Sequence, residues 1–524
     1  MANKNLFNTV LAKMGFVPKA DAINEAGGVA YALSPKAQLA QFAATGCLNS
    51  TYYASADEQL NTVLTLCTSP DVSPEFIARV ALYARDKAHM KDMPALLVAS
   101  LSTLGPGLMA EVFDRVIDSP KMLRNFVQIM RSGVTGRKSL GSLPKRLIQQ
   151  WLDRRSDDQV FRASVGNNPS LADVIRMVHP KPATAARAAL YAYLIGRSYN
   201  AADLPELVKQ FEAFKAGESK TVPDVPFQLL TSLELNTEQW TQIARNAPWQ
   251  MTRMNLNTFA RHGVFNDNVV GKEIANRLRS EDQISRARVF PYQLMVAFTQ
   301  ADKEVPGFVR DALQDAMEIA TRNVPAITGQ IFICPDVSSS MHSAVTGHRQ
   351  GATSAVRCVD VAALVAACFL RVNRDAEVIP FTETVVTGLV LNPRDSVMTN
   401  AKKMTEIPPG GTNCSAPLAM LNSRKAKGDL VVYVSDNESW VDRSANRGTA
   451  MMTEWVTFKH RNPTAKLVCI DLQPYKTTQV VDTGRDDVLN IGGFSDHVFQ
   501  LIAEFANGAL GNDHWVEVIE KVSI

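Results

Sequence analysis

The chain has 524 residues, of which 46% are hydrophobic and 20% are charged, a balance that is ordinary for a globular protein of several domains. Its longest uncharged apolar run, residues 361–370, is far shorter than the roughly 18 residues that suggest a membrane span. Residues 1–17 show neither a continuous apolar core nor a small-residue cleavage site, so we expect no secretion signal and no membrane partner.

The seven cysteines indicate a reducing compartment. Their number is odd, they are widely spaced, and no two of them form a Cys-x-x-Cys pair. This pattern is typical of free thiols and argues against both a disulfide framework and a zinc site. We therefore expect a cytoplasmic protein.

Charge is distributed unevenly along the chain. Residues 1–325 contain 37 lysines and arginines against 31 acidic residues, whereas residues 326–524 contain 18 against 21. Between residues 119 and 152 there are seven basic residues and no acidic one: Lys121, Arg124, Arg131, Arg137, Lys138, Lys145 and Arg146. A stretch of this kind favours a polyanionic partner such as nucleic acid.

Residues 1–325 carry helical signals almost throughout. Serine followed by proline, a favoured helix start, occurs at Ser34, Ser73 and Ser119. Ser55 and Glu58 form a capping box, after which apolar residues follow at the spacing of one helical face. Helices of about 10 to 16 residues recur with short breaks and without intervening strand patterns. We predict stacked helical hairpins, HEAT-like but without a strict sequence period.

Two basic parts of this helical region are candidates for phosphate contacts. A glycine-containing loop, residues 133–141, leads into Lys145 and Arg146 at the start of a predicted helix. Backbone amides and cations in such a place can hold phosphate groups. A second basic group further along the chain includes Arg253 and Arg261.

From residue 329 onward the pattern changes to alternating strands and helices, which predicts a doubly wound α/β domain. The candidate strands are residues 330–335, 376–381, 387–391, 429–435 and 465–472. The candidate helices are residues 358–372, 417–425, 450–460 and 495–504.

Three stretches of the α/β region place oxygen ligands at or near strand ends. The first predicted strand runs into Asp336, Ser338 and Ser340, an Asp-x-Ser-x-Ser pattern whose oxygens can converge on one hard cation. A glycine turn presents Thr412, and a later strand ends on Asp436. Because parallel strands end at one edge of their sheet, we expect these side chains to meet there.

In this order the three stretches resemble the metal-ion-dependent adhesion site of von Willebrand factor A domains. The resemblance implies that Asp336, Ser338 and Ser340 hold a divalent cation directly, with Mg²⁺ as the expected ion. It implies that Thr412 and Asp436 bind the ion directly or through water. The remaining coordination position would accept an acidic group from a partner.

The whole chain resembles the TROVE family, to which the Ro ribonucleoproteins belong. Three segments carry the resemblance: residues 46–53, similar to the family's Gly/Thr-Tyr-Tyr segment; residues 256–263, similar to its Arg/Asn-rich helix; and residues 435–440, close to its Asp-Asn-Glu-x-Trp motif. The family implies a multidomain fold. An all-α, HEAT-like helical-repeat ring in residues 1–325 is followed by a von Willebrand factor A-like domain in residues 326–524.

The function that the resemblance implies is RNA binding. The family's basic outer surface binds a small noncoding Y RNA, and its central hole takes single-stranded ends of misfolded RNAs. In bacterial members the Y RNA provides the link to an exoribonuclease. We therefore expect a monomer that acts in noncoding RNA quality control and stress-linked RNA processing.

By this analogy the RNA contacts fall into two sets, matched by segment rather than by strict motif. Those on the outer surface are Arg137, Lys138, Lys145, Arg146, Arg176, His179 and Lys181, and those nearer the hole are Arg253, Arg261 and His262. Each single cation is also compatible with a solvated surface role. His179 follows a predicted helix, where a capping or packed imidazole is an equal alternative to an RNA contact.

We expect no enzymatic activity. Asp336 lacks the second aspartate of a phosphatase-type Asp-x-Asp loop, and the sequence contains neither a Walker loop nor a His-Glu-x-x-His motif. Metal-dependent nucleases gather several carboxylates, whereas only Asp336 and Asp436 are clearly placed here. The alternative function is a protein-interaction scaffold that binds acidic ligands through the ion and has no affinity for RNA.

Overall fold

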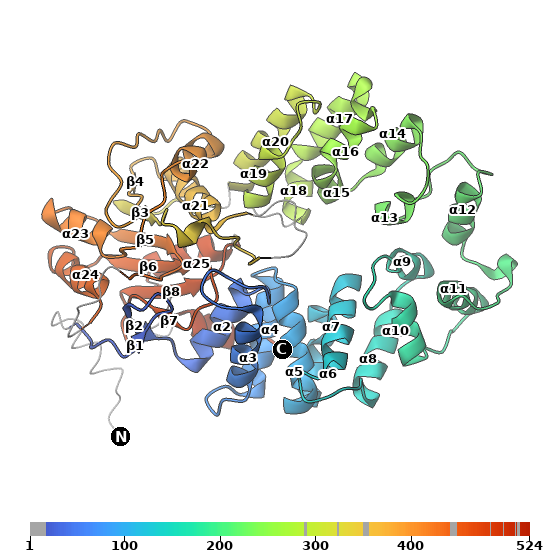
Figure 1. The fold of residues 1–524 in the computed structure, drawn as a ribbon, viewed down its shortest axis with the longest axis horizontal. Helices are drawn as coiled ribbons and strands as arrows, with labels where there is room; N and C mark the ends of the chain where they lie inside the picture. The colour runs from blue at the N-terminus through green and yellow to red at the C-terminus, as the bar shows by residue number, and fades with distance from the viewer. Residues whose placement is uncertain are drawn as a thin grey trace. The chain divides into compact units, whose positions relative to one another are not determined.

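The computed structural model (Figure 1) describes residues 17–287, 291–321, 324–348, 356–440, 448–482, 484–495, 497–508, 510 and 514–524. These residues form two compact units that do not follow the order of the chain. The first unit takes in residues 1–94, 289–296 and 317–523, and the second takes in residues 95–288 and 297–316. The predicted boundary between residues 325 and 326 follows the change of secondary structure along the chain and stays a prediction.

The first unit is built around a five-stranded parallel sheet with the strand order β4-β3-β5-β6-β8. The strands are β3 (Ile331–Pro335), β4 (Glu377–Val378), β5 (Leu430–Ser435), β6 (Lys466–Asp471) and β8 (Val488–Gly492). From β3 the chain first crosses to β4 on one side and then returns to β5 on the other, so the sheet is doubly wound. The switch point between β3 and β5 is where such folds place ligands.

Helices cover both faces of this sheet (Figure 1). They are α21 (Cys358–Val372), α22 (Val397–Thr405), α23 (Ala416–Ser423), α24 (Ala450–Arg461), α25 (His497–Ala506) and α26 (His514–Glu520). Every residue of β3 and β5 is buried, as expected for strands with helices on each side. One core cluster joins Phe332 and Tyr433 of the sheet to Leu418 of α23 and Trp455 of α24.

The predicted α/β fold is confirmed, with differences in single elements. The strands expected at residues 330–335, 429–435 and 465–472 are present, and the strand expected at 376–381 is reduced to the two residues of β4. Residues 387–391 form no strand, because this surface stretch pairs with no neighbouring strand. The helix α22 and the strand β8 were not predicted.

Residues 17–94 pack on the sheet within the first unit. They contain β1 (Ala22–Ile23), β2 (Val29–Ala32), α2 (Pro35–Thr45), α3 (Ala56–Cys67) and α4 (Pro74–Asp86). β2 pairs with β7 (Thr477–Thr478), as Figure 1 shows, and α2 contacts β8 and α26. The expectation of an almost wholly helical first region is therefore wrong at β1 and β2, whose short strands are stabilised by a partner far along the chain.

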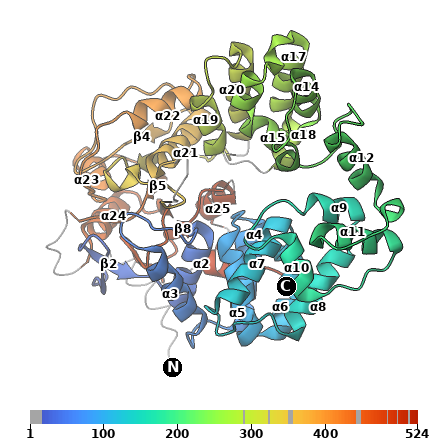
Figure 2. The same cartoon turned by 45° about the vertical axis from the view of Figure 1, so that its right-hand side comes forward.

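The second unit consists of helices within the described residues (Figure 2). They are α5 (Asp92–Leu104), α6 (Pro106–Val116), α7 (Pro120–Ser132), α8 (Ser142–Asp153), α9 (Asp157–Arg162), α10 (Leu171–Val178), α11 (Ala185–Ile195), α12 (Glu206–Lys215), α13 (Phe227–Leu230), α14 (Thr237–Asn246), α15 (Trp249–Met254), α16 (Leu256–Arg261), α17 (Asn268–Leu278) and α18 (Glu281–Ala287). The short 3-10 turns are η1 (Ala201–Asp203), η2 (Val264–Asn266) and, in the first unit, η4 (Ser340–His342). The helices α19 (Pro291–Thr299) and α20 (Gly307–Ala320) each contribute to both units.

Helices close in sequence pack on one another in the second unit, as in stacked hairpins. α8 contacts α6 and α10, α10 contacts α7 and α11, and α17 contacts α14 and α15. The serine-proline starts are confirmed: Ser119 caps α7 by accepting a hydrogen bond from the Met122 N–H, and Pro120 follows it. The ring that the family resemblance implies stays a prediction.

Candidate metal centre and nucleic-acid interface

The three stretches predicted to hold a cation meet at the carboxyl ends of β3 and β5. The Ser435 hydroxyl donates to Asp336 Oδ2 at 2.6 Å, which joins the ends of the two strands. The Ser339 N–H donates to the Gly410 carbonyl at 2.9 Å. The Trp440 N–H donates to the Thr412 carbonyl at 3.3 Å, so the glycine turn is tied to both strand ends.

Ser340 connects the predicted ligands to one another. Its hydroxyl lies 3.4 Å from that of Ser338, and its interaction with the Asp436 carboxylate favours the charged form of that group. Asp336 and Ser338 are completely buried, and Ser340, Thr412 and Asp436 are each at most 4% exposed. The structure therefore brings all five predicted residues into one enclosed place, as the motif order predicts.

The carboxyl groups at this place repel one another and are buried. Burial raises the pKa of Asp336, and the neighbouring charge of Asp436 raises it further. Burial likewise raises the pKa of Asp436, and burial followed by the charge of Asp436 raises that of Glu438. Among the described residues, no lysine, arginine or histidine forms an ion pair with these three carboxyl groups.

The donor set fits a hard divalent cation. Carboxylate and hydroxyl oxygens are the ligands that Mg²⁺ prefers, and a doubly charged ion offsets the repulsion between Asp336 and Asp436. Within the described part of the chain, no three carboxylate, imidazole or thiol side chains are grouped closely enough to share an ion. Hydroxyl groups and water would therefore supply the rest of the coordination.

Two tyrosines that the sequence did not assign to the site, Tyr53 and Tyr475, also surround it, together with Glu438. The Tyr53 phenol lies near the Ser340 side chain, and its ring packs against that of Tyr475 with centroids 5.9 Å apart. Burial raises the pKa of Tyr53, and the charges of Asp436 and Glu438 raise it further. In the sequence, the Tyr-Tyr segment at residues 46–53 and the Asp-Asn-Glu-x-Trp motif at residues 435–440 were the signals that pointed to these side chains. Neither motif shows that the two segments meet in the fold.

The basic loop between α7 and α8 is exposed. Arg137, Lys138, Lys145 and Arg146 all have exposed side chains. None of these four side chains has an ion-pair or hydrogen-bond partner among the described residues. Gly133, Gly136 and Gly141 adopt left-handed φ angles of 88°, 80° and 73°, which explains why glycine recurs in this loop. The four cations are thus available to an anionic ligand.

The end of α10 lies beside α8, which brings His179 close to Gln149 in the second half of α8. The Gln149 side chain donates to the Val178 carbonyl at 2.6 Å. His179 has a left-handed φ of 50° and terminates α10, while its side chain stays exposed, as does that of Lys181. Arg176 is less available, because it donates to the Ile195 carbonyl at 2.7 Å and pairs with Asp173 at 3.2 Å.

The second predicted set lies on α15 and α16, and its members have protein contacts. Arg253 donates to Gln250 Oε1 at 3.1 Å, and Arg261 donates to the Thr258 hydroxyl at 3.2 Å. The His262 ring stacks on that of Trp240 with centroids 4.0 Å apart. No described contact joins this set to the loop between α7 and α8, so the assignment of all ten residues to RNA stays a prediction.

Comparisons with known proteins identify the family. The family model for the Ro60 von Willebrand factor A domain matches residues 330–506. A relative from Deinococcus radiodurans, described as RNA-binding protein RO60, is 25% identical, and the match covers 93% of this chain and 95% of that protein. The comparisons thus support the resemblance of this chain to the Ro, or TROVE, family.

Other comparisons agree with this Ro-family assignment. The crystal structure of the Ro (RSR) protein of D. radiodurans matches 91% of this chain and 100% of the solved one, with a TM-score of 0.61 and 21% identity, which supports the fold. The RNA-binding protein RO60 of Caenorhabditis elegans is 24% identical over 45% of this chain and 37% of its own length. The predicted family and fold class are both confirmed.

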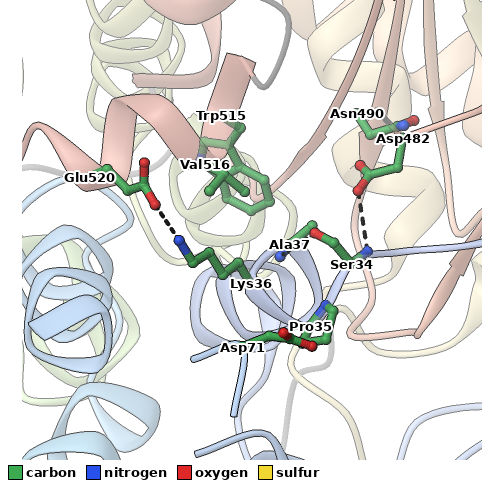
Figure 3. Close-up of a pocket in the computed structure, with 10 residues that line it drawn as sticks. All are labelled: Ser34, Pro35, Lys36, Ala37, Asp71, Asp482, Asn490, Trp515, Val516 and Glu520. Atoms are coloured by element: carbon green, nitrogen blue, oxygen red, sulfur yellow. Dashed lines mark hydrogen bonds and ion pairs between the residues drawn. The ribbon is translucent and has the colours of Figure 1, made fainter. Parts of the chain in front are cut away.

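A separate pocket of this Ro-family protein lies between the start of α2 and α26 (Figure 3). Lys36 pairs with Glu520 across it, and the Ser34 N–H donates to Asp482 at 3.3 Å. Its charged groups thus serve the packing of α2 against α26.

Among the described residues, no helix is both long and apolar enough to cross a membrane.

Proposed function

We propose that this Ro-family protein binds RNA: a small noncoding RNA of the Y type and the single-stranded ends of misfolded or structured RNAs. Two relatives are described as RNA-binding proteins, and one of them is similar over nearly the whole chain. The observation that carries the proposal is the exposed, unpaired cluster of Arg137, Lys138, Lys145 and Arg146. Phosphate contacts from such cations supply most of the sequence-independent affinity of RNA-binding proteins.

The proposal includes a role in noncoding RNA quality control and stress-linked RNA processing, with an exoribonuclease partner reached through the RNA. It describes a cytoplasmic monomer without enzymatic activity. All seven cysteines are free thiols, which supports a reducing compartment.

The proposal also includes a divalent cation, Mg²⁺, held by Asp336, Ser338, Ser340, Thr412 and Asp436. Bound there, the cation would supply positive charge that neutralises the buried carboxylates.

The test is a filter-binding titration of the full chain with a structured RNA that carries a single-stranded 3′ tail, and with a blunt duplex, over a range of salt. We expect tight, tail-dependent and salt-sensitive binding. In the variant with Arg137, Lys138, Lys145 and Arg146 all replaced by Ala, the slope of log affinity against log salt should fall by about 3, since each lost phosphate contact removes ~0.7 to 0.9.

The control removes the same charge elsewhere in the second unit, through Ala substitutions at the exposed residues Lys215, Lys220, Lys272 and Lys303. It should leave the slope nearly unchanged. An equal loss in both variants would mean that only net charge matters and that the loop between α7 and α8 is not the interface. Absence of binding to either RNA at low salt would favour the scaffold function instead.

A further inference from the structure

The pocket between the start of α2 and α26 has the dimensions of a small-molecule site (Figure 3). Its volume is about 520 Å³, within the range of roughly 300 to 1,000 Å³ in which proteins hold small ligands. Every residue that lines it belongs to the first unit. None of the residues predicted to hold the cation or RNA is among them, so a ligand here would be a separate one.

Two helices give this pocket apolar walls. Figure 3 shows Trp515 and Val516 of α26 on one side and Pro35, at the start of α2, on the other. The Trp515 indole donates to the Tyr83 hydroxyl at 2.9 Å, which fixes the orientation of the ring. Hydrocarbon of a ligand can therefore pack between the two helices and leave water.

The charged groups that line the pocket are mostly acidic. They are the carboxylates of Asp71, Asp482 and Glu520 and the amine of Lys36. Three carboxylates and one amine give these lining residues a net charge of −2. The amine already pairs with Glu520 at 2.5 Å and lies 5.2 Å from the centroid of the Phe76 ring. The lining therefore favours a cationic ligand over an anionic one.

The start of α2 does not turn the pocket into an anion site. The Ser34 hydroxyl accepts a hydrogen bond from the Ala37 N–H at 3.2 Å, and Pro35 has no N–H to offer. The Ser34 N–H donates to Asp482 Oδ2 at 3.3 Å. Because the backbone donors of a first helical turn are what holds an anion, their use within the chain leaves little for an external one.

Asp71 and Asp482 can each accept a hydrogen bond from an ammonium group. Asp71 lies in the turn between α3 and α4, is exposed, and forms no ion pair with another described residue. Asp482 is half-buried, and a carboxylate has about four acceptor positions, so its bond from Ser34 leaves room for others. Figure 3 shows the two carboxylates at different ends of the lining, with Ser34 and Pro35 between them. A ligand that reaches both needs two cationic groups and a spacer.

We propose that this pocket binds a small organic dication, an alkyl chain with an ammonium group at each end. One ammonium group pairs with Asp71 and the other with Asp482. The methylene groups between them pack against Pro35, Trp515 and Val516, and the two positive charges balance the net charge of the lining. The inference depends neither on RNA binding nor on the cation assigned to the ends of β3 and β5.

The test is calorimetric titration of the full chain, free of RNA and Mg²⁺, at low salt, where exposed charges are least screened. The probes are α,ω-diaminoalkanes from diaminopropane to diaminohexane, with butylamine as the singly charged comparison. We expect saturable binding that is tightest at one spacer length, because the chain fixes the separation of the two carboxylates. Butylamine should bind about fivefold more weakly or less tightly still, since it forms only one ion pair.

Asp71→Asn tests the charge of the pocket and keeps the size of the side chain. It should weaken binding of the best diamine about three- to fivefold, the upper part of the range for an exposed ion pair. Asp375→Asn is the matched control, because Asp375 is also an exposed aspartate of the first unit and lies outside the pocket. It should bind the diamine as the wild type does. Equal losses in the two variants would mean that only net charge matters, and the proposal would be wrong.

Val516→Phe tests the cavity, because it adds bulk to the wall without changing the charge. It should abolish diamine binding in a chain that circular dichroism shows to be folded. Val390→Phe, at a position that is 78% exposed elsewhere in the first unit, should not. Normal diamine binding by folded Val516→Phe would overturn the proposal, as would a wild-type chain that binds no diamine or prefers inorganic phosphate. The wild-type titrations need no variant, so they decide the matter even if Val516→Phe unfolds.

Discussion

At the scale of single residues, the ion pair between Asp487 and Arg485 shows how a buried charge is stabilised. Both residues are at most 5% exposed, and Arg485 donates to Asp487 at 2.7 and 2.6 Å. The Trp455 indole adds a third hydrogen bond at 3.0 Å. Burial alone raises the pKa of Asp487, but the hydrogen bonds and charge of Arg485 outweigh it, so that the pKa lies below its ordinary value.

A pH-dependent contribution to stability follows from this lowered pKa. The contribution is fully present above the unfolded-state pKa of about 3.9 and is lost as the pH falls through the lower folded-state pKa. Asp487→Asn leaves Arg485 buried without its partner and should cost about 3 to 5 kcal/mol at pH 7. Guanidinium unfolding at pH 7 and at pH 3 should show the difference from wild type shrinking at the lower pH.

The control is Glu377→Gln, which removes the partner of Arg424 in a surface ion pair of the same unit. Because exposed ion pairs contribute about 0 to 1 kcal/mol, this variant should stay close to wild type at both pH values. A constant deficit of Asp487→Asn across the pH range would show that lost packing, and not charge, causes the effect.

The metal centre shows which residues of a site the sequence can predict. The proximity of Asp336, Ser338, Ser340 and Asp436 was predictable, since each lies at or just beyond a strand end and strand ends of a parallel sheet converge, and that of Thr412 from the glycine turn that presents it. The place of Tyr53 was not predictable, because it depends on how residues 17–94 dock on the sheet. Local pattern carries no information about contacts between segments some 400 residues apart, such as Ala26 and Glu438.

At the scale of elements, local sequence pattern likewise fails to predict strands that have no independent stability. The long apolar strands β3, β5 and β6 were predictable from composition, and the capped helices α2, α4 and α7 from their serine-proline starts. β1, β2 and β7 are two to four residues long and exist only as partners of one another. Residues 387–391 have the composition of a strand and form none, because a strand needs a neighbour.

The packing of α26 on α4 gives a prediction at this scale. Trp515 is 5% exposed, and its indole donates to the Tyr83 hydroxyl at 2.9 Å. Trp515→Ala should destabilise the first unit by about 3 to 5 kcal/mol through the cavity that it leaves. Trp515→Phe should cost less, about 1 to 3 kcal/mol, chiefly because the buried Tyr83 hydroxyl loses its donor.

Thermal unfolding followed by circular dichroism measures both Trp515 variants against wild type. Val390→Ala is the control, because Val390 is 78% exposed and its truncation should change the free energy of unfolding by no more than about 0.5 kcal/mol. Equal stability of Trp515→Ala and wild type would show that α26 contributes nothing to the core.

At the scale of the whole molecule, the order of residues along the chain and their division into compact units differ. Tyr31 lies in the same core cluster as Trp455, and Gln41 of α2 donates to the Gln473 carbonyl at 2.9 Å. Residues 17–94 thus complete the core of the α/β domain from the opposite end of the sequence. A chain that begins at residue 326 would leave these apolar and polar groups without their partners.

We therefore expect residues 326–524 alone to melt at a lower temperature than the same residues joined through a flexible linker to residues 17–94. Loss of the buried hydrogen bond between Trp515 and Tyr83, at about 1 to 3 kcal/mol, by itself corresponds to roughly 2 to 12 °C. Trp515→Ala should then cost less in the isolated fragment than in the joined protein, because Tyr83 is missing and the two changes act on one contact. Equal melting temperatures would instead mean that the α/β domain is independently stable and that contacts with residues 17–94 add nothing to its stability.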